Sequence, residues 1–167
     1  MSLEAQVLLS FLAHETDVTD VGRKTRITPV NYWQAFTDGT GAGQAQIVWS
    51  DSGTATTTPT DLNLAALPDT RDGAAVTVTF TAVKAVFVRN KSTTNALNVG
   101  GSFALTAAAV FPATVLYQVA AGGCYCVVSP TDEGITINPN GVRIARVAAA
   151  SGTADYDIVF IGEGTIT

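Results

Sequence analysis

His14 is the only histidine in the chain, so a Ser-His-Asp or Cys-His catalytic site would have to use it. It follows a short apolar segment and begins a polar stretch, residues 14–27, for which we expect a loop. Nothing in this pattern predicts the walled pocket that a catalytic histidine needs. At the end of a helix its imidazolium would instead interact with the helix dipole. We therefore expect no catalytic role for His14.

Paired carboxylates are the next candidates, because glycosidases use two facing carboxylates and calcium sites use clustered oxygens. The chain has three close pairs: Asp69 and Asp72, Asp132 and Glu133, Asp155 and Asp157. The last pair alternates with apolar residues, as on a strand with one face in solvent. The first pair lies in a turn-forming sequence that lacks the EF-hand pattern. We therefore predict neither catalysis nor metal binding at these pairs.

Cysteine and glycine spacings give no stronger signal. Cys124 and Cys126 are one residue apart, so on a strand they share a face at a distance too long for a normal disulfide. Two thiols alone do not make a zinc site, and we expect buried free thiols in a protein folded in a reducing compartment. The glycines of Gly39–Gly43 depart from the dinucleotide-binding spacing and predict a loop. We expect no cofactor.

Trp33 and Trp49 are the aromatic candidates for ligand binding. Together with Tyr32, and with the Ser/Thr-rich loop expected over Ser50–Pro59, they could form a platform for a sugar or a base. Large aromatics on strands are more often part of a core. Both interpretations remain open from the sequence.

The composition favours a protein that works by contact. Charged residues make up 14% of the chain, below the roughly 25% of typical globular proteins, and the net charge is −5. A surface poor in charge is typical of a subunit in an assembly, although a compact monomer with a neutral polar surface is the alternative. The basic residues are scattered apart from Arg23–Arg26, so we expect no nucleic-acid partner. No apolar run is long enough for a membrane span, and no basic region precedes the first apolar segment.

The N-terminal segment has a helical pattern. Its apolar residues follow a helical stripe, namely Leu3, Val7, Leu8, Phe11 and Leu12. We expect a helix here and an arm over residues 1–26, packing either on its own domain or on a neighbouring subunit. Residues 27–167 are expected to form the main domain.

The longest predicted strand is Val76–Asn90, where the apolar phase changes at Ala82–Val83. Such a change predicts a β-bulge, a change of sheet, or a segment that is covered on both faces. We expect the N-terminal segment or a second subunit to cover Val83–Val88, which makes Val83 and Phe87 candidate assembly contacts.

Short strands separated by turn signals fill most of the rest of the chain, including a turn at Asn138–Gly141. Eight or more such strands predict an all-β fold, a β-sandwich or jelly roll with a short N-terminal helix or arm.

The order of these segments also resembles that of a known class of protein. The similarity spans most of the chain, and its motifs are glycine turns and alternating strands: Gly39–Gln46, Val48–Asp51, Thr60–Leu64, Val76–Asn90, Asn98–Gly101, Gly122–Gly123, Ser129–Pro130 and Val142–Gly162. The chain resembles small β-rich virion structural proteins of tailed bacteriophages. The resemblance implies a capsid decoration (cement) protein or a subunit of a tail, spike or fibre, and it implies no functional residues.

We therefore expect a non-enzymatic virion protein, folded in the host cytoplasm. The leading hypothesis is a capsid decoration subunit that forms a homotrimer and binds other virion proteins such as the major capsid protein. The alternative is a tail-associated module that recognises host glycans through Trp33 and Trp49.

Overall fold

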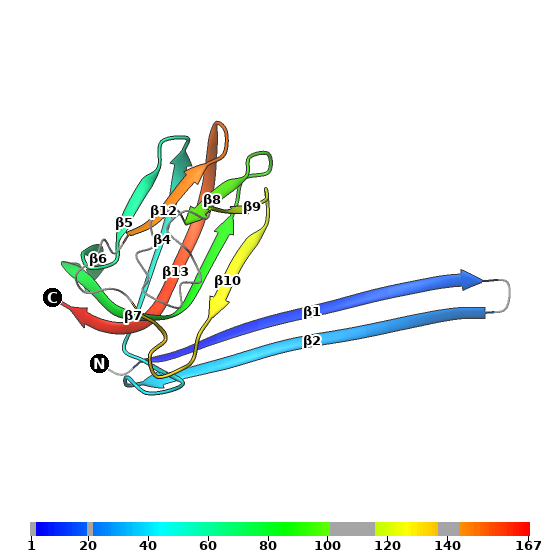
Figure 1. The fold of residues 1–167 in the computed structure, drawn as a ribbon, viewed down its shortest axis with the longest axis horizontal. Coiled ribbons are helices and arrows are strands. Elements are labelled where there is room, and N and C mark those ends of the chain that lie inside the picture. Colours follow the sequence, from blue (N-terminus) through cyan, green and yellow to red (C-terminus); the bar gives the residue numbers. More distant parts are fainter. Residues whose placement is uncertain (1–2, 20–21, 101–115, 137–143) are drawn as a thin grey trace.

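The fold consists of a β-sandwich body and a long N-terminal β-hairpin (Figure 1). The computed structural model describes residues 3–19, 22–100, 116–136 and 144–167. These residues contain thirteen strands and no helix: β1 Glu4–Thr19, β2 Gly22–Asp38, β3 Gln44–Ala45, β4 Ile47–Thr56, β5 Thr60–Asn63, β6 Leu67–Arg71, β7 Ala74–Asn90, β8 Leu97–Gly100, β9 Leu116–Val119, β10 Cys124–Val128, β11 Ile135–Thr136, β12 Ile144–Ala149 and β13 Thr153–Ile166. The all-β sandwich expected from the strand spacing is confirmed.

Two sheets form the sandwich. The first has the order β10-β7-β13-β4, with β6 and β11 also paired to β7, and the second has the order β5-β12-β8-β9. The core lies between them, where Trp49 stacks on Phe160 with 5.8 Å between ring centroids. Phe80 meets Phe160 edge to face, and Val99 and Val147 of the second sheet belong to the same apolar cluster. Burial of this cluster stabilises the body.

Strand β7 confirms the predicted irregularity and contains two bulges. Its pairing with β13 skips Thr81 and then Lys84, so each of these residues is an extra residue in the ladder. Each bulge shifts the side-chain alternation by one position. The inward set is therefore Val78, Phe80, Val83, Val86 and Val88, all of which are buried in the sandwich core.

Gly162 and Gly164 of β13 lie opposite the two bulges. A Cβ on Gly162 would collide with the carbonyl oxygen of Ala82, and one on Gly164 would collide with that of Thr79. Real side chains do not tolerate such contacts. The two glycines therefore allow the bulged backbone of β7 to lie against β13.

The helix expected over residues 3–12 is wrong, because these residues belong to β1. Strands β1 and β2 pair without interruption from Glu4 opposite Thr37 to Thr19 opposite Gly22. Apolar residues occur on both faces of this hairpin, and their spacing imitates a helical stripe. The sequence of β2, with its apolar and aromatic residues, favours a strand. Because β2 pairs with β1, the backbone groups of β1 are hydrogen-bonded in a ladder, and this pairing favours a strand over a helix. We call residues 3–38 the arm; residue 26, the expected end of the N-terminal unit, lies inside β2.

Three further expectations concern loops and turns: two need correction, and one lies outside the described residues. The loop expected over residues 14–27 is mostly strand, and the loop expected over Ser50–Pro59 is strand as far as Thr56. Ladder pairing with β13 keeps this Thr- and Ser-rich sequence extended. The turn predicted at Asn138–Gly141 lies outside the described residues.

Candidate interaction surface

The root of the arm packs on the outer face of the first sheet. Phe36 of β2 is fully buried and forms a second apolar cluster with Ala45, Ala85 and Ile161. Leu3, Ala5 and Val7 of the arm pack against this cluster as half-buried residues. The N-terminal segment therefore covers the outer face of β7 at Ala85. This confirms that this part of β7 is covered on both sides.

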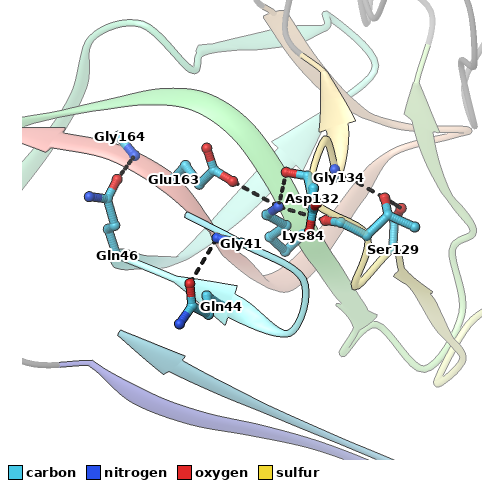
Figure 2. Close-up of polar contacts among 10 residues, drawn as sticks. Gly41, Gln44, Gln46, Lys84, Ser129, Asp132, Gly134, Glu163 and Gly164 are labelled. Atoms are coloured by element: carbon cyan, nitrogen blue, oxygen red, sulfur yellow. Dashed lines mark hydrogen bonds and ion pairs between the residues drawn. The ribbon is translucent and has the colours of Figure 1, made fainter. Parts of the chain in front are cut away.

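Beside the arm root, the side chain of Lys84 holds the loop that contains Asp132 against strands β7 and β13 (Figure 2). This bulged residue is fully buried, and its Nζ donates hydrogen bonds to the carbonyl oxygens of Thr131 at 2.6 Å and Asp132 at 2.5 Å. Nζ also lies 2.7 Å from Glu163 Oε1, to which no other hydrogen-bond donor comes within reach in the described residues. A buried ammonium needs such partners, because its desolvation would otherwise be costly.

Backbone hydrogen bonds connect the Lys84 site to the arm. Ser129 N donates to Lys84 O at 2.7 Å, and Gly43 N donates to Pro130 O at 2.8 Å. Gly43 lies in the turn after β2, and its carbonyl oxygen accepts a hydrogen bond from Thr37 N of β2. The segment Ser129–Gly134 therefore joins the bulge of β7 to the base of the arm, which restricts the angle at which the arm leaves the body.

Beyond its root, the arm extends away from the body (Figure 1). The large apolar side chains that are exposed in the described residues all lie on it: Leu8 is 67% exposed, Trp33 61% and Val30 57%, with Leu9 and Tyr32 also exposed. Leu8 is opposite Trp33 and Leu9 is opposite Tyr32 in the ladder, so the two pairs lie on opposite faces of the hairpin. Clustered exposure of this kind is typical of an interaction site.

An apolar groove lies between the arm and the outer sheet face. It has a volume of about 260 Å³, and the residues that line it include Val7, Leu9, Phe87, Cys126, Val159 and Ile161. Phe87, Cys126 and Val159 are half-buried, so the groove leaves apolar surface open beside the packed root.

In the ladder of the arm, Glu15 is opposite Arg26 and Asp17 is opposite Lys24. The basic cluster noted in the sequence is therefore part of the hairpin ladder.

The predicted assembly contacts have different environments. Leu3 and Val7 lie at the packed root, Leu8 is exposed on the arm, and Phe87 lines the groove. Val83 is wrong as an assembly contact, because the bulges turn it into the sandwich core, where it is 2% exposed. Phe11 and Leu12 lie in β1, and their side chains are outside the described part of the structure.

The structure separates the two tryptophans and places His14 on a strand. Trp49 is 3% exposed, and its Nε1 donates to Pro68 O at 2.9 Å in the core, whereas Trp33 is on the arm. A platform that uses both tryptophans is therefore wrong. His14 pairs with Ile27 in the hairpin, so no helix dipole acts on it.

Three of the paired carboxylates, Asp69, Asp155 and Asp157, take part in structural contacts. Asp157 accepts a hydrogen bond from Ser52 Oγ and pairs with Lys91 Nζ at 2.6 Å; its hydrogen bond with Lys91 is the largest cause that lowers its pKa. Asp155 accepts from Thr54 Oγ1, and Asp69 pairs with Arg71 beside the tight turn into β7. In the described residues, no three His, Cys, Asp or Glu side chains are grouped to hold a metal ion.

The two cysteines are free, as expected, but Cys124 is exposed and only Cys126 is half-buried. Burial raises the pKa of the Cys126 thiol, with a smaller contribution from Cys124. The two cysteines are two residues apart on β10, so their side chains lie on the same face of the sheet. Cys124 is opposite Arg89 of β7, and Cys126 is opposite Phe87. Strand β10 is at the edge of its sheet, which explains the exposure.

Lys84 is the important residue that the sequence analysis missed. A single lysine inside an otherwise apolar run, Ala82–Val88, was the available signal. A charged residue in such a run indicates either an exposed position or a paired buried charge.

Comparison of the chain with protein-family models, with curated proteins and with solved structures finds no match. In the part of the chain that the structure describes, no helix has the length and apolar character to cross a membrane.

Proposed function

We propose that the chain is a non-enzymatic structural subunit of a tailed-bacteriophage particle. Its most direct role would be capsid decoration, in which the subunit stabilises the shell by binding neighbouring proteins. The observation that carries the proposal is the arm, a projecting hairpin with large apolar side chains exposed on both faces.

Such an arm has low stability of its own and exposes apolar side chains to water. An isolated two-stranded hairpin is marginally stable, and this one is supported by the body at its root. Complete burial of one large apolar side chain contributes roughly 1.5–3 kcal/mol. Covering the exposed parts of Leu8, Leu9, Val30, Tyr32 and Trp33 would therefore contribute on the order of 5 kcal/mol. A protein partner along the arm gives this surface a function.

Two sequence features support the same role. The chain is poor in charge, which suits a subunit that is surrounded by protein. The order of its glycine turns and strands resembles that of small virion proteins of tailed phages. We propose a homotrimer as the assembled form, with the major capsid protein as its neighbour in the shell.

Glycan recognition in a tail or fibre is the second candidate, and the exposure of Trp33 and Tyr32 favours it. Sugar sites combine an aromatic face with polar groups that bind hydroxyls. Trp33 is instead opposite Leu8, and Tyr32 is opposite Leu9. This aliphatic setting favours a protein partner.

Electron microscopy of purified particles from the phage that encodes the chain tests the proposal. We expect the sandwich body in many copies on the outer surface of the capsid, with the arm buried against a neighbouring protein. Leu8→Ser/Trp33→Ser particles should lose the subunit, whereas Thr70→Ser particles, altered at an exposed position on β6, should retain it. The decoration proposal fails if the chain is missing from the particle. A location at the tail tip, with Trp33-dependent binding on a glycan array, would support the second candidate.

A further inference from the structure

We propose that the partner of the arm is a second copy of this chain, whose groove between β1 and the outer sheet face receives the apolar residues of the incoming arm. The inference rests on the proposed function in that it takes the arm as the contact element. It adds the identity of the partner and the surface that the arm occupies.

The groove has the chemistry of a side-chain acceptor. Its volume of about 260 Å³ is below the roughly 300–1,000 Å³ of typical small-molecule sites. Aliphatic and aromatic side chains form most of its walls, and Gln6 and Cys126 are the exceptions. A small polar ligand would find few groups to fix its orientation, whereas Leu, Val or Trp side chains from a protein would fill the space.

The groove also continues a contact that the chain already makes. At the root, Ala5, Val7 and Phe36 of the hairpin cover Ala85 and Ile161 of the sheet. Just beyond this contact, Phe87 and Val159 remain half-buried on the same sheet face. A second hairpin of the same composition would extend the packing from the covered part of the face to the open part.

Leu8 and Leu9 of β1 line this groove in their own chain, whereas the exposed Val30, Tyr32 and Trp33 of β2 are not among its lining residues. The arm itself extends away from the body (Figure 1). Each copy therefore has an apolar projection on β2 and an apolar acceptor between β1 and the sheet face. Contact between two different patches of identical subunits is heterologous, and it forms a ring when the rotation closes. Arm exchange of this kind is compatible with the homotrimer proposed above.

A directed disulfide between two differently tagged chains tests the contact. The first chain is Val30→Cys/Cys124→Ser/Cys126→Ser, whose single thiol is on the exposed part of the arm. The second is Cys124→Ser, whose single thiol is Cys126 in the groove. The chains are mixed and oxidised under alkaline conditions, because burial raises the pKa of Cys126. The matched control replaces Val30→Cys with Thr70→Cys in the same background, since Thr70 is exposed on β6.

We expect a disulfide between the two tagged chains at least tenfold more abundant than with the Thr70→Cys control. Leu8→Ser/Trp33→Ser in the first chain should remove most of it, and sedimentation of that variant should show a monomer. A disulfide yield equal to that of the control, together with a monomeric unmodified chain at high concentration, would overturn the inference.

The two proposals fail in distinguishable ways. If the chain stays monomeric in solution but its arm variant is lost from the particle, the arm binds another protein, and only the inference on the partner is wrong. If arms exchange between copies but the chain is missing from the particle, the proposed function is wrong and the inference stands.

Discussion

Lys84 Nζ and Glu163 Oε1 lie 2.7 Å apart and join the second bulge of β7 to the neighbouring strand β13. The bulge places an extra residue at this point, and the Lys84 side chain leaves the strand toward the loop that contains Thr131 and Asp132. The lysine thus connects the main sheet to the loop that holds the arm root.

Lys84→Met should destabilise the protein by about 3 kcal/mol, because it removes the partner of a largely buried carboxylate and two carbonyl hydrogen bonds. Lys91→Met is the control: the Lys91–Asp157 pair is more exposed, so we expect a much smaller loss. Urea unfolding measures both. Amide exchange should also rise in Ser129–Gly134 for Lys84→Met alone; equal effects of the two variants would contradict the assigned role.

Gly162→Ala should destabilise the body by roughly 3 kcal/mol, because its Cβ would collide with the carbonyl oxygen of Ala82. The colliding atom belongs to a central strand and cannot move aside easily. Gly73→Asn is the matched control, because Gly73 has φ +81° in the β6–β7 turn and no atom within 4 Å of an added Cβ. Thermal unfolding should separate the two variants. An unchanged melting temperature for Gly162→Ala would mean that the bulge relaxes.

The two tryptophans should respond in opposite ways. Trp49→Ala should cost about 3–5 kcal/mol of folding stability, because it empties a core position against Phe160. Trp33→Ser should change the stability of the isolated chain by less than about 0.5 kcal/mol but weaken its association. Chemical unfolding and sedimentation measure the two effects. A large stability loss in Trp33→Ser would show that the ring is packed within its own chain.

Acid should weaken the link between β5 and β12. The hydrogen bond from Arg146 lowers the pKa of Asp61, with burial opposing and the charge of Arg146 adding to the shift. The folded pKa is below the unfolded one, so the stabilisation is present above about pH 4 and is lost as the pH falls through the folded pKa. Asp61→Asn should therefore be less stable than wild type near neutral pH and should approach it in acid. Both groups are over a third exposed, so the effect is small.

Unfolding of wild type, Asp61→Asn, Arg146→Gln and the double variant near pH 7 and near pH 3 measures this effect. The coupling between the two positions should be smaller at the lower pH. A coupling that is independent of pH would show that the pair acts through packing.

The body of the fold was predictable from local pattern, whereas the arm was not. Alternation along Val76–Asn90 predicted a strand with an irregularity, because a bulge changes the side-chain phase in the sequence itself. Alternation also predicted that Tyr156, Ile158 and Phe160 are buried while Asp155 faces solvent. The predicted helix in the arm is wrong because an apolar spacing at i, i+4 and i+5 fits both a helix and a strand with two apolar faces. Its pairing partner, β2, decided between them.

The site was predictable only in part. Phe87 and the N-terminal apolar residues are expected at a contact, but Val83 does not share the face of Phe87. The alternation places Val83 and Phe87 on one face, whereas the bulge at Lys84 lies between them and puts them on opposite faces. The different environments of Trp33 and Trp49 depend on which strand extends beyond the body. No local pattern contains that information.

The position of β13 between β7 and β4 has a consequence for folding during synthesis. β1 and β2 are adjacent in the chain and are made first, but the residues that support the arm root, Ala85 and Ile161, are made later. β4 must wait about a hundred residues for β13, its neighbour in the main sheet, where Thr56 pairs with Thr153. High contact order slows this closure. A nascent chain would thus expose the apolar residues of the arm before Ala85 and Ile161 are available to pack against its root, so chaperone binding during translation should begin at the arm.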